Sequence, residues 1–350
     1  MRTERSVSIP TLLEIGAGTV DDLGALLANA PLDLARPLIG TGGTRTGEVA
    51  ARAREQLGVG PDAVVSGLAG DPGSIEAVVG AIGRRSVTCC IAVGGGRVID
   101  TVKQASALTG VPFVSVPTSL SHDGICSPIA SLVLADGRRE SVGAVMPEAV
   151  VVDLAVVGSS PRRAMRAGAG DLLSNLTALQ DWRLASARGR DSFDGYSALI
   201  AEASAHAFLY LAGAAAELSL EVLARGLVLS GLAMATAGTS RPCSGAEHLI
   251  SHSLDRILRE RARLHGEQVA LGTLIASAAH GEVPSELRAA YEALGLPRRC
   301  GDLGLETAEV VEAVMAAPAT RPERYTILDE TDLSRAAVEE LVARALDDLH

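Results

Sequence analysis

Aromatic residues are scarce in this chain of 350 residues: they make up 2% of it, whereas hydrophobic residues of all kinds make up 47%. A core of ordinary size is therefore available, but it must be built from Ala, Val, Leu and Ile. Positive charge is also in short supply, since 31 Lys and Arg face 42 Asp and Glu and the net charge is −11. Nucleic-acid surfaces need clustered Lys and Arg, so the composition argues against nucleic-acid binding.

Cysteine is present, but not in the spacing of a disulfide framework or a thiolate metal site. The five cysteines are an odd number, and no two of them form a C-x-x-C pair. Cys89 and Cys90 are adjacent within an apolar run, which favours small buried core residues. Neither disulfides nor a zinc knuckle are expected.

Signals for export and membrane insertion are missing as well. Residues 1–10 include charged side chains and no apolar segment of the kind found in signal peptides. We find no uncharged apolar stretch of about 18 residues, the length associated with crossing a bilayer. The expectation is a cytoplasmic protein with no membrane partner.

The first half of the chain alternates short apolar runs with helical patterns. The expected strands are 12–16, 36–41, 63–66, 87–93, 112–116, 129–134 (a hairpin arm with its turn at Asp136-Gly137) and 149–153. The expected helices between them are 19–28, 48–57, 74–82 and 97–108. Alternation of this kind predicts a Rossmann-like α/β domain with a mostly parallel, doubly wound sheet.

Strand patterns nearly disappear after Pro161, and long Ala- and Leu-rich segments follow. The expected helices are 171–184, 197–211, 216–236, 246–258, 265–279, 285–294, 307–316 and 334–347. We therefore expect two domains, an α/β domain over 1–160 and an all-α domain over 161–350.

Glycines and hydroxyls follow neighbouring strands of the predicted sheet. Gly94-Gly95-Gly96 links the strand 87–93 to a helix, and glycine there lets backbone N–H groups approach a pyrophosphate. The loop after the next strand carries Thr118 and Ser119, at the sheet edge where ligands bind in open α/β folds. The loop 41–45 contains Arg45 and no acidic residue, which allows a 2′-phosphate. The pattern favours NAD or NADP, although the glycines are not the G-x-G-x-x-G fingerprint.

Three segments of the second half carry possible metal ligands. His248 and His252 are four residues apart and so share one helix face. His265 begins another predicted helix, and Asp171 follows Gly-Ala-Gly at an expected helix start, where an ordinary N-cap is the alternative. One carboxylate and two imidazoles form a three-ligand set that leaves a position open for water or substrate. Spacing alone does not decide which residues form it.

Taken together, these motifs resemble those of the sn-glycerol-1-phosphate dehydrogenases, a branch of the superfamily that includes iron-dependent alcohol dehydrogenases and dehydroquinate synthases. The resemblance runs from about residue 10 to 345. The segments that carry it are Gly94–Asp100, Pro117-Thr118, Ser121–Gly124, Ser127-Pro128, Gly170–Ser174, Asp181-Trp182, Ser244–His248, Ser251–Asp255, His265–Gln268 and Arg321–Leu328.

The resemblance implies a dehydroquinate synthase-like fold, with a domain that binds NAD(P) followed by a helical domain that binds metal and substrate. Asp171, His248 and His265 would hold one divalent metal, usually zinc, with nickel or iron in relatives. Asp123 and His252 would be catalytic and would face the substrate. Asp171 would also contact the substrate. The residues implied for NAD or NADP are Gly94, Gly95, Gly96, Arg97, Val98, Asp100, Thr118, Ser119, Ser121 and Ser127.

The expected reaction is NAD(P)H-linked interconversion of dihydroxyacetone phosphate and sn-glycerol 1-phosphate, with the metal polarising the carbonyl. Arg241, just before the predicted metal helix, is a candidate contact for the substrate phosphate. Gln180 stands where many relatives carry Lys, which keeps open a dehydrogenase of unphosphorylated polyols or specialised-metabolite ketones. Less favoured are a dehydroquinate synthase-like cyclase and a non-catalytic nucleotide-binding protein. A homo-oligomer is also expected.

Overall fold

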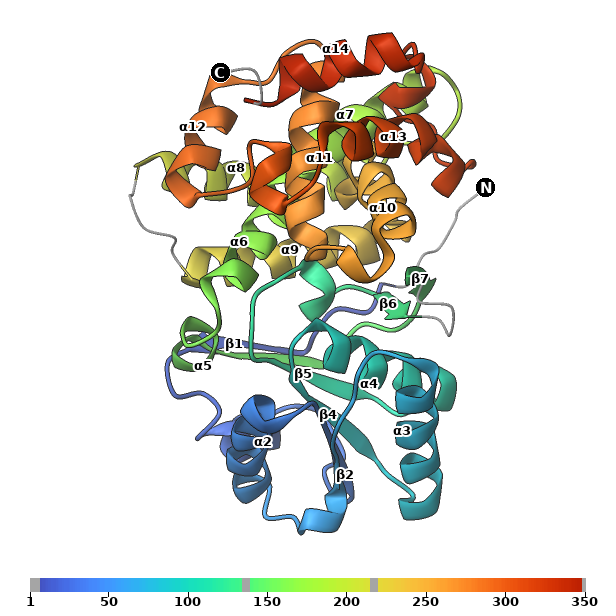
Figure 1. Cartoon of the computed structure of the whole chain (residues 1–350). Coiled ribbons are helices and arrows are strands. Elements are labelled where there is room, and N and C mark those ends of the chain that lie inside the picture. The colour runs from blue at the N-terminus through green and yellow to red at the C-terminus, as the bar shows by residue number, and fades with distance from the viewer. Residues whose placement is uncertain (1–6, 134–138, 215–219, 348–350) are drawn as a thin grey trace. The chain divides into compact units, whose positions relative to one another are not determined.

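The structure is a computed structural model that describes residues 7–133, 139–214 and 220–347. Its contacts divide the chain into two compact units (Figure 1). The sheet unit consists of residues 1–160 with 234–238, and the helical unit of residues 161–233 with 239–350. We propose that the expected ranges 1–160 and 161–350 are the two domains of the chain.

The sheet unit contains a six-stranded sheet in the order β1-β8-β5-β4-β2-β3, and every neighbouring pair of strands is parallel. The predicted parallel sheet is thus confirmed. The strands are β1 (Leu12–Gly16), β2 (Pro37–Thr41), β3 (Val64–Val65), β4 (Cys89–Gly94), β5 (Phe113–Pro117) and β8 (Ala149–Asp153). A separate antiparallel pair, β6 (Ile129–Val133) and β7 (Arg139–Gly143), forms the expected hairpin. Its predicted turn at Asp136-Gly137 lies outside the described residues.

Helices pack on both faces of the sheet because successive strand residues point to opposite sides. In β2, Ile39 belongs to the aliphatic core that includes Leu23 of α1 and Ala50 of α2. The next residue, Gly40, faces α4, where a Cβ would lie 2.5 Å from Val102 Cγ2. The helices of this unit are α1 (Leu23–Ala28), α2 (Thr44–Gln56), α3 (Pro72–Arg85), α4 (Gly96–Thr109) and α5 (Leu154–Gly158).

The five cysteines are all free and buried. Burial, the largest cause, raises the pKa of Cys89 and of Cys126 to about 12 and that of Cys90 to about 11. A thiol rather than a reactive thiolate is therefore present at neutral pH.

We expect the native protein to resist alkylation by iodoacetamide at pH 8, and all five thiols to react once it is unfolded in urea. Mass spectrometry of the alkylated chain gives the count. Rapid labelling of Cys89 or Cys126 in the native protein would contradict the buried placement.

The helical unit consists of helices that mostly match the expected ranges. They are α6 (Arg162–Leu173), α7 (Asn175–Ala187), α8 (Gly195–Ala214), α9 (Leu220–Ala237, whose last residues count with the sheet unit), α10 (Ala246–Leu258), α11 (His265–Ala279), α12 (Ser285–Leu294), α13 (Thr307–Ala316) and α14 (Arg335–Ala345).

One expected helix, 171–184, is wrong. Asp171 does not begin a helix: it lies in the last turn of α6, and α7 starts only after Ser174. The glycines before Asp171 allow a close helix crossing instead of a break. A Cβ at Gly170 would lie 2.4 Å from Gly266 O, and one at Gly266 would lie 1.9 Å from Ala167 O. Only glycine lets α6 and α11 approach this closely.

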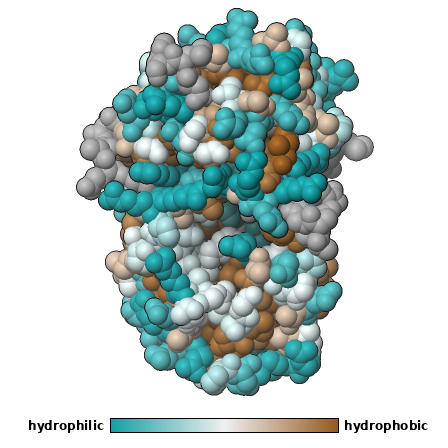
Figure 2. All heavy atoms as spheres, viewed as in Figure 1, coloured by the Kyte–Doolittle hydropathy of each residue, from teal (hydrophilic) through white to brown (hydrophobic). Residues whose placement is uncertain are grey.

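Helix α9 is long and apolar enough to cross a membrane by length and composition alone. It carries Glu221 and Arg225, however, and 56% of it is buried inside the structure, as in a core helix of a soluble protein. Figure 2 shows mostly hydrophilic side chains over the visible face of the helical unit.

Candidate metal centre and cofactor loops

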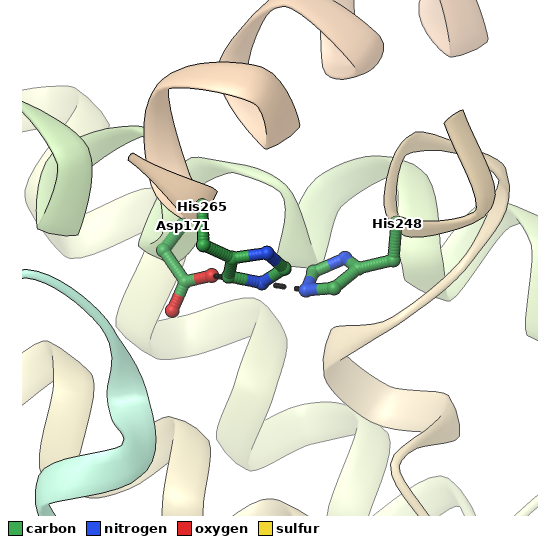
Figure 3. A group of neighbouring side chains, drawn as sticks. All are labelled: Asp171, His248 and His265. Carbon is green, nitrogen blue, oxygen red and sulfur yellow. Dashed lines mark ion pairs between the residues drawn. The ribbon is translucent and has the colours of Figure 1, made fainter. Parts of the chain in front are cut away.

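Three helices of the helical unit bring Asp171, His248 and His265 together (Figure 3). Asp171 comes from the end of α6, His248 from the first turn of α10, and His265 is the first residue of α11. One possible ligand atom from each lies within 4.8 Å of the others. The Nε2 atoms of both imidazoles are 3.7 Å from Asp171 Oδ1. A carboxylate and two imidazoles in this arrangement are a typical three-ligand set for a divalent metal.

Buried Glu247 determines which ring nitrogen of His248 carries the proton. His248 Nδ1 is 3.0 Å from Glu247 Oε1, which also accepts from the backbone N–H of Gly245 at 2.5 Å. Burial opposes ionisation of Glu247, but the hydrogen bond and charge of His248 and the backbone donors outweigh it and lower its pKa. An ionised carboxylate only accepts, so Nδ1 carries the proton and Nε2 keeps its lone pair for a metal.

His265 is supported in a similar way by a hydroxyl and an amide side chain. Its Nδ1 is 3.2 Å from Ser251 Oγ, and Gln268 Nε2 donates to the same hydroxyl at 3.2 Å. The amide of Gln268 also donates to Asp255 Oδ1 at 3.0 Å. With Nδ1 occupied, His265 presents Nε2 toward Asp171. Both imidazoles and the carboxylate therefore fit a resident divalent cation by the chemistry of their nitrogen and oxygen atoms.

His252 lies one turn after His248 on α10, but it is outside this ligand group. Its ring centroid is 6.5 Å from that of His248 and 6.1 Å from that of His265. Burial, followed by the charges of Arg321, His248 and other cations, lowers the pKa of His252 well below its usual value. His252 is therefore a neutral imidazole beside the candidate metal centre.

A second buried carboxylate, Asp181, joins the segments around this centre. Its Oδ2 accepts from Ala246 N–H at 2.6 Å, at the start of α10, and its Oδ1 accepts from Ile327 N–H at 2.7 Å. The same Oδ1 is 3.0 Å from His280 Nε2. Desolvation by burial is the main cause that raises the pKa of Asp181. The sequence contained Asp181 in a family motif, but nothing in its neighbours indicated this role.

Arg241, the residue singled out for a substrate phosphate, is buried and already has partners. Its Nε donates to Asp191 Oδ2 and its Nη1 to Tyr325 O, both at 2.7 Å. Arg241 thus holds the segment that follows Arg321 against the start of α10.

In the sheet unit, the loops after β4 and β5 are neighbours. Thr118 N–H donates to Gly94 O at 2.9 Å, and a Cβ on Gly95 would lie 3.2 Å from Ser119 Oγ. A Cβ on Gly94 would lie 2.6 Å from Val98 in the first turn of α4. The structure therefore brings together several of the expected cofactor residues at the carboxyl edge of the sheet, beside the N-terminus of α4.

Asp100, also expected at the cofactor, is buried in a network of the protein's own groups. Its Oδ1 is 3.0 Å from Lys103 Nζ, and its Oδ2 accepts from Ser131 N–H at 3.2 Å. Lys103 in turn donates to Gly124 O at 2.8 Å. We interpret Asp100 and Lys103 as residues that position the segment beginning with Asp123. Ser127 is buried as well, with its hydroxyl 3.3 Å from Ile129 O, whereas Arg97 is exposed and Ser121 half-buried.

His122 lies over the last glycine of the glycine turn. Its Nδ1 accepts from Gly124 N–H at 2.9 Å, so a neutral ring carries its proton on Nε2. A Cβ on Gly96 would lie 1.9 Å from that Nε2. Gly96 is therefore required for His122 to cover the start of α4.

We expect Gly96→Ala to weaken NADH binding by about 10-fold or more, because the new methyl group displaces His122 from the start of α4. Calorimetric titration with NADH measures the dissociation constant. Gly83→Ala is the matched control, since a Cβ there meets nothing within 4 Å. Equal NADH affinity of the Gly96→Ala variant and the wild type would contradict the assignment of this turn.

Comparison with known proteins places the chain among dehydrogenases. The family model described as iron-containing alcohol dehydrogenase matches residues 14–161. The glycerol-1-phosphate dehydrogenase (NAD(P)+) of Pyrococcus furiosus is 41% identical over 268 residues, which are 76% of this chain and 77% of that protein. The enzyme of the same name from Cenarchaeum symbiosum is 36% identical over 345 residues, 94% of this chain and 93% of its own.

Solved structures agree on the fold. A probable glycerol dehydrogenase from Sinorhizobium meliloti 1021 has a TM-score of 0.77 at 26% identity, covering 97% of each chain. Maleylacetate reductase from Agrobacterium tumefaciens has a TM-score of 0.73 at 18% identity and covers 99% of each chain, a likeness of fold alone. The predicted combination of a parallel-sheet domain and a helical domain is confirmed as a glycerol dehydrogenase-like fold.

Proposed function

We propose, since this chain belongs to the family of glycerol-1-phosphate dehydrogenases (NAD(P)+), that it interconverts dihydroxyacetone phosphate and sn-glycerol 1-phosphate. The reducing equivalent is a hydride exchanged with NAD(H) or NADP(H). The observation that carries the proposal is the group of Asp171, His248 and His265, in which each imidazole presents Nε2 toward the carboxylate.

These three residues would hold one divalent cation, zinc in the first place because two nitrogens and one carboxylate oxygen are a common zinc set, with nickel or iron as alternatives. The chemistry that such a cation supplies is polarisation of the substrate carbonyl. Glu247 and Ser251 keep the two imidazoles oriented for this task through their Nδ1 atoms.

We assign proton handling and substrate contact to His252 and Asp123, with Asp171 also contacting substrate. A neutral His252 has one ring N–H to donate and one lone pair to accept with. That state suits a residue that passes a proton to or from a substrate hydroxyl.

For the cofactor, we assign the pyrophosphate to the Gly94–Gly96 turn and the start of α4, with Arg97, Val98, Thr118, Ser119 and Ser121 around it. Asp100 and Ser127 support the same loops from within the sheet unit. Arg45 is exposed at the start of α2, after the loop that follows β2. A side chain there is available to a 2′-phosphate, so both NADH and NADPH are proposed as cofactors.

Metal analysis combined with a reduction assay tests the proposed function. We expect about one divalent ion per chain, and oxidation of NADH or NADPH when dihydroxyacetone phosphate is added. A higher kcat/KM for dihydroxyacetone than for its phosphate would instead favour the polyol dehydrogenase that Gln180 left open. Product formation without net consumption of NAD(P)H would favour a cyclase. We further propose that the protein is cytoplasmic and forms a homo-oligomer. Light scattering of the purified protein checks the oligomeric state.

A further inference from the structure

Three arginines of the helical unit gather beside the candidate metal centre, and we call them the arginine cluster: Arg241, Arg321 and Arg324. Arg241 precedes α10, and the other two belong to the segment between η6 (Ala317–Thr320) and η7 (Ile327–Asp329). They come from two parts of the chain that Arg241 joins directly through its hydrogen bond to Tyr325 O.

The cluster is held next to α10, the helix that carries His248 and His252. Arg324 Nη1 donates to Ser244 O at 2.6 Å, one turn before His248, and Nη2 donates to Ser240 Oγ at 2.8 Å. On the other side of Arg321, η6 packs on α10, where Arg256 donates to Thr320 O at 3.2 Å. Arg321 is therefore held between two points that are both fixed to this helix.

Charges of the cluster act on His252, which lies beside the metal centre. Arg321 and Arg324 are both among the cations that disfavour protonation of His252. The ring of His252 is in turn 6.1 Å from that of ligand His265 and 6.5 Å from that of ligand His248. The positive charge thus lies on the side of the metal centre that His252 occupies.

Among the residues that the structure describes, only one of the three arginines in the cluster is paired with a carboxylate. Arg241 is paired with Asp191, but the partners of Arg324 are neutral oxygens. Within the described ranges of the chain, the guanidinium group of Arg321 makes no ion pair or hydrogen bond, and the carboxylate that acts on it is that of exposed Glu323.

Burial and repulsion between like charges are evident in both guanidinium groups. Desolvation lowers the pKa of Arg321, and desolvation with the charges of Arg321 and Arg241 lowers that of Arg324 to about 9. Glu247 also acts on Arg324, but its oxygens already accept from His248, Gly245 and Thr177. A half-buried site with two guanidinium groups outside ion pairs is complementary to an anion with two negative charges.

We propose that Arg321 and Arg324 bind the phosphate group of the substrate, with Arg321 as the residue that selects phosphorylated over unphosphorylated trioses. The inference rests on the proposed function, since it assigns the phosphate of that substrate to named side chains. Guanidinium groups match a phosphate because they offer paired N–H donors in one plane. Arg324 is oriented by its two bonds to neutral oxygens, and Arg241 reinforces the positive charge from behind while it remains paired with Asp191. Hydrogen bonds and ion pairs within the protein explain the position of Arg241 and in part that of Arg324. They do not explain that of Arg321.

The test compares Arg321→Gln with the wild type on two substrates. We expect kcat/KM for dihydroxyacetone phosphate to fall by about 10- to 100-fold, mainly through KM, because one charge-assisted contact to phosphate is lost. The value for unphosphorylated dihydroxyacetone should fall much less than that for the phosphate, and inhibition by inorganic phosphate should weaken. Arg162→Gln is the matched control, since Arg162 is an exposed arginine of the same unit and loses the same charge.

Arg321→Lys should lose less than Arg321→Gln, because lysine keeps the charge but not the planar pair of donors. Metal content and circular dichroism verify that each variant is folded. An unchanged ratio of the two kcat/KM values in Arg321→Gln would overturn the proposal while leaving the proposed function intact. A wild-type protein that reduces dihydroxyacetone as well as its phosphate would count against both the arginine assignment and the proposed function. A wild-type protein that reduces neither ketone would refute the proposed function itself.

Discussion

Replacement of His248 by Ala is expected to remove the bound metal and to reduce turnover of dihydroxyacetone phosphate by at least about 1,000-fold. His248 supplies one of only three protein ligands in the group, and its Nε2 lies 3.7 Å from Asp171 Oδ1. Losing it leaves a carboxylate and one imidazole, too few to hold a catalytic divalent ion tightly. The lost carbonyl polarisation is worth several kcal/mol, and each 1.36 kcal/mol is a factor of ten in rate.

Metal analysis and steady-state kinetics on the same preparation check this result. His206→Ala is the matched control, because His206 is an exposed residue of α8. Glu247→Gln provides a graded case: it keeps the shape of the side chain but removes the charge that accepts from His248 Nδ1, so metal affinity should fall by about 10- to 100-fold. Full turnover by a metal-free His248→Ala protein would refute the assignment of the centre.

Asp181→Ala is expected to destabilise the protein by about 3–5 kcal/mol, the cost of removing one partner from a buried charged network. The substitution leaves three groups without their acceptor: the buried Ala246 N–H and the part-buried Ile327 N–H and His280 Nε2. Because Ala246 begins α10, which carries His248, the metal affinity should fall together with the stability.

Urea denaturation followed by circular dichroism measures the first effect, and competition with a chelator measures the second. The control is Asp22→Ala, at an exposed position whose side chain makes no capping hydrogen bond; a surface change of this kind stays within about 0.5 kcal/mol. If Asp181→Ala denatured at the same urea concentration as the wild type, Asp181 would not be the residue that joins these segments.

The sequence predicts the secondary structure well where a single segment contains the whole signal. The strand 12–16 and the helices 246–258 and 265–279 have the predicted bounds in the structure. Continuous apolar runs, such as the one through Cys89 and Cys90, correctly indicate strands buried on both faces of a parallel sheet. Periodicity and turn residues are local, so they can be detected without knowledge of the partner elements.

The polar networks are a different case, because their partners are far apart in the chain. Lys103 is the clearest example: no motif in the sequence indicates a role for it, yet it is fully buried and joins Asp100 to the segment after β5. Asp181 joins three other segments in the same manner. Any Asp or Lys in a helical pattern is usually exposed, and only the packing of the described elements identifies these two as buried.

What the sequence by itself determined is the order of strands and helices, the glycine turn after β4 and the residue types suited to a metal. The assembly of the metal centre was decided by the tertiary structure. Gly-Ala-Gly before Asp171 looked like the start of a helix, since glycine often interrupts one. In the structure, Gly170 and Gly266 lack side chains so that α6 and α11 can cross in contact. That crossing brings Asp171 to His265, and α10 adds His248. A glycine needed for close approach and one needed for a turn are identical in sequence, and only the element packed against it distinguishes them.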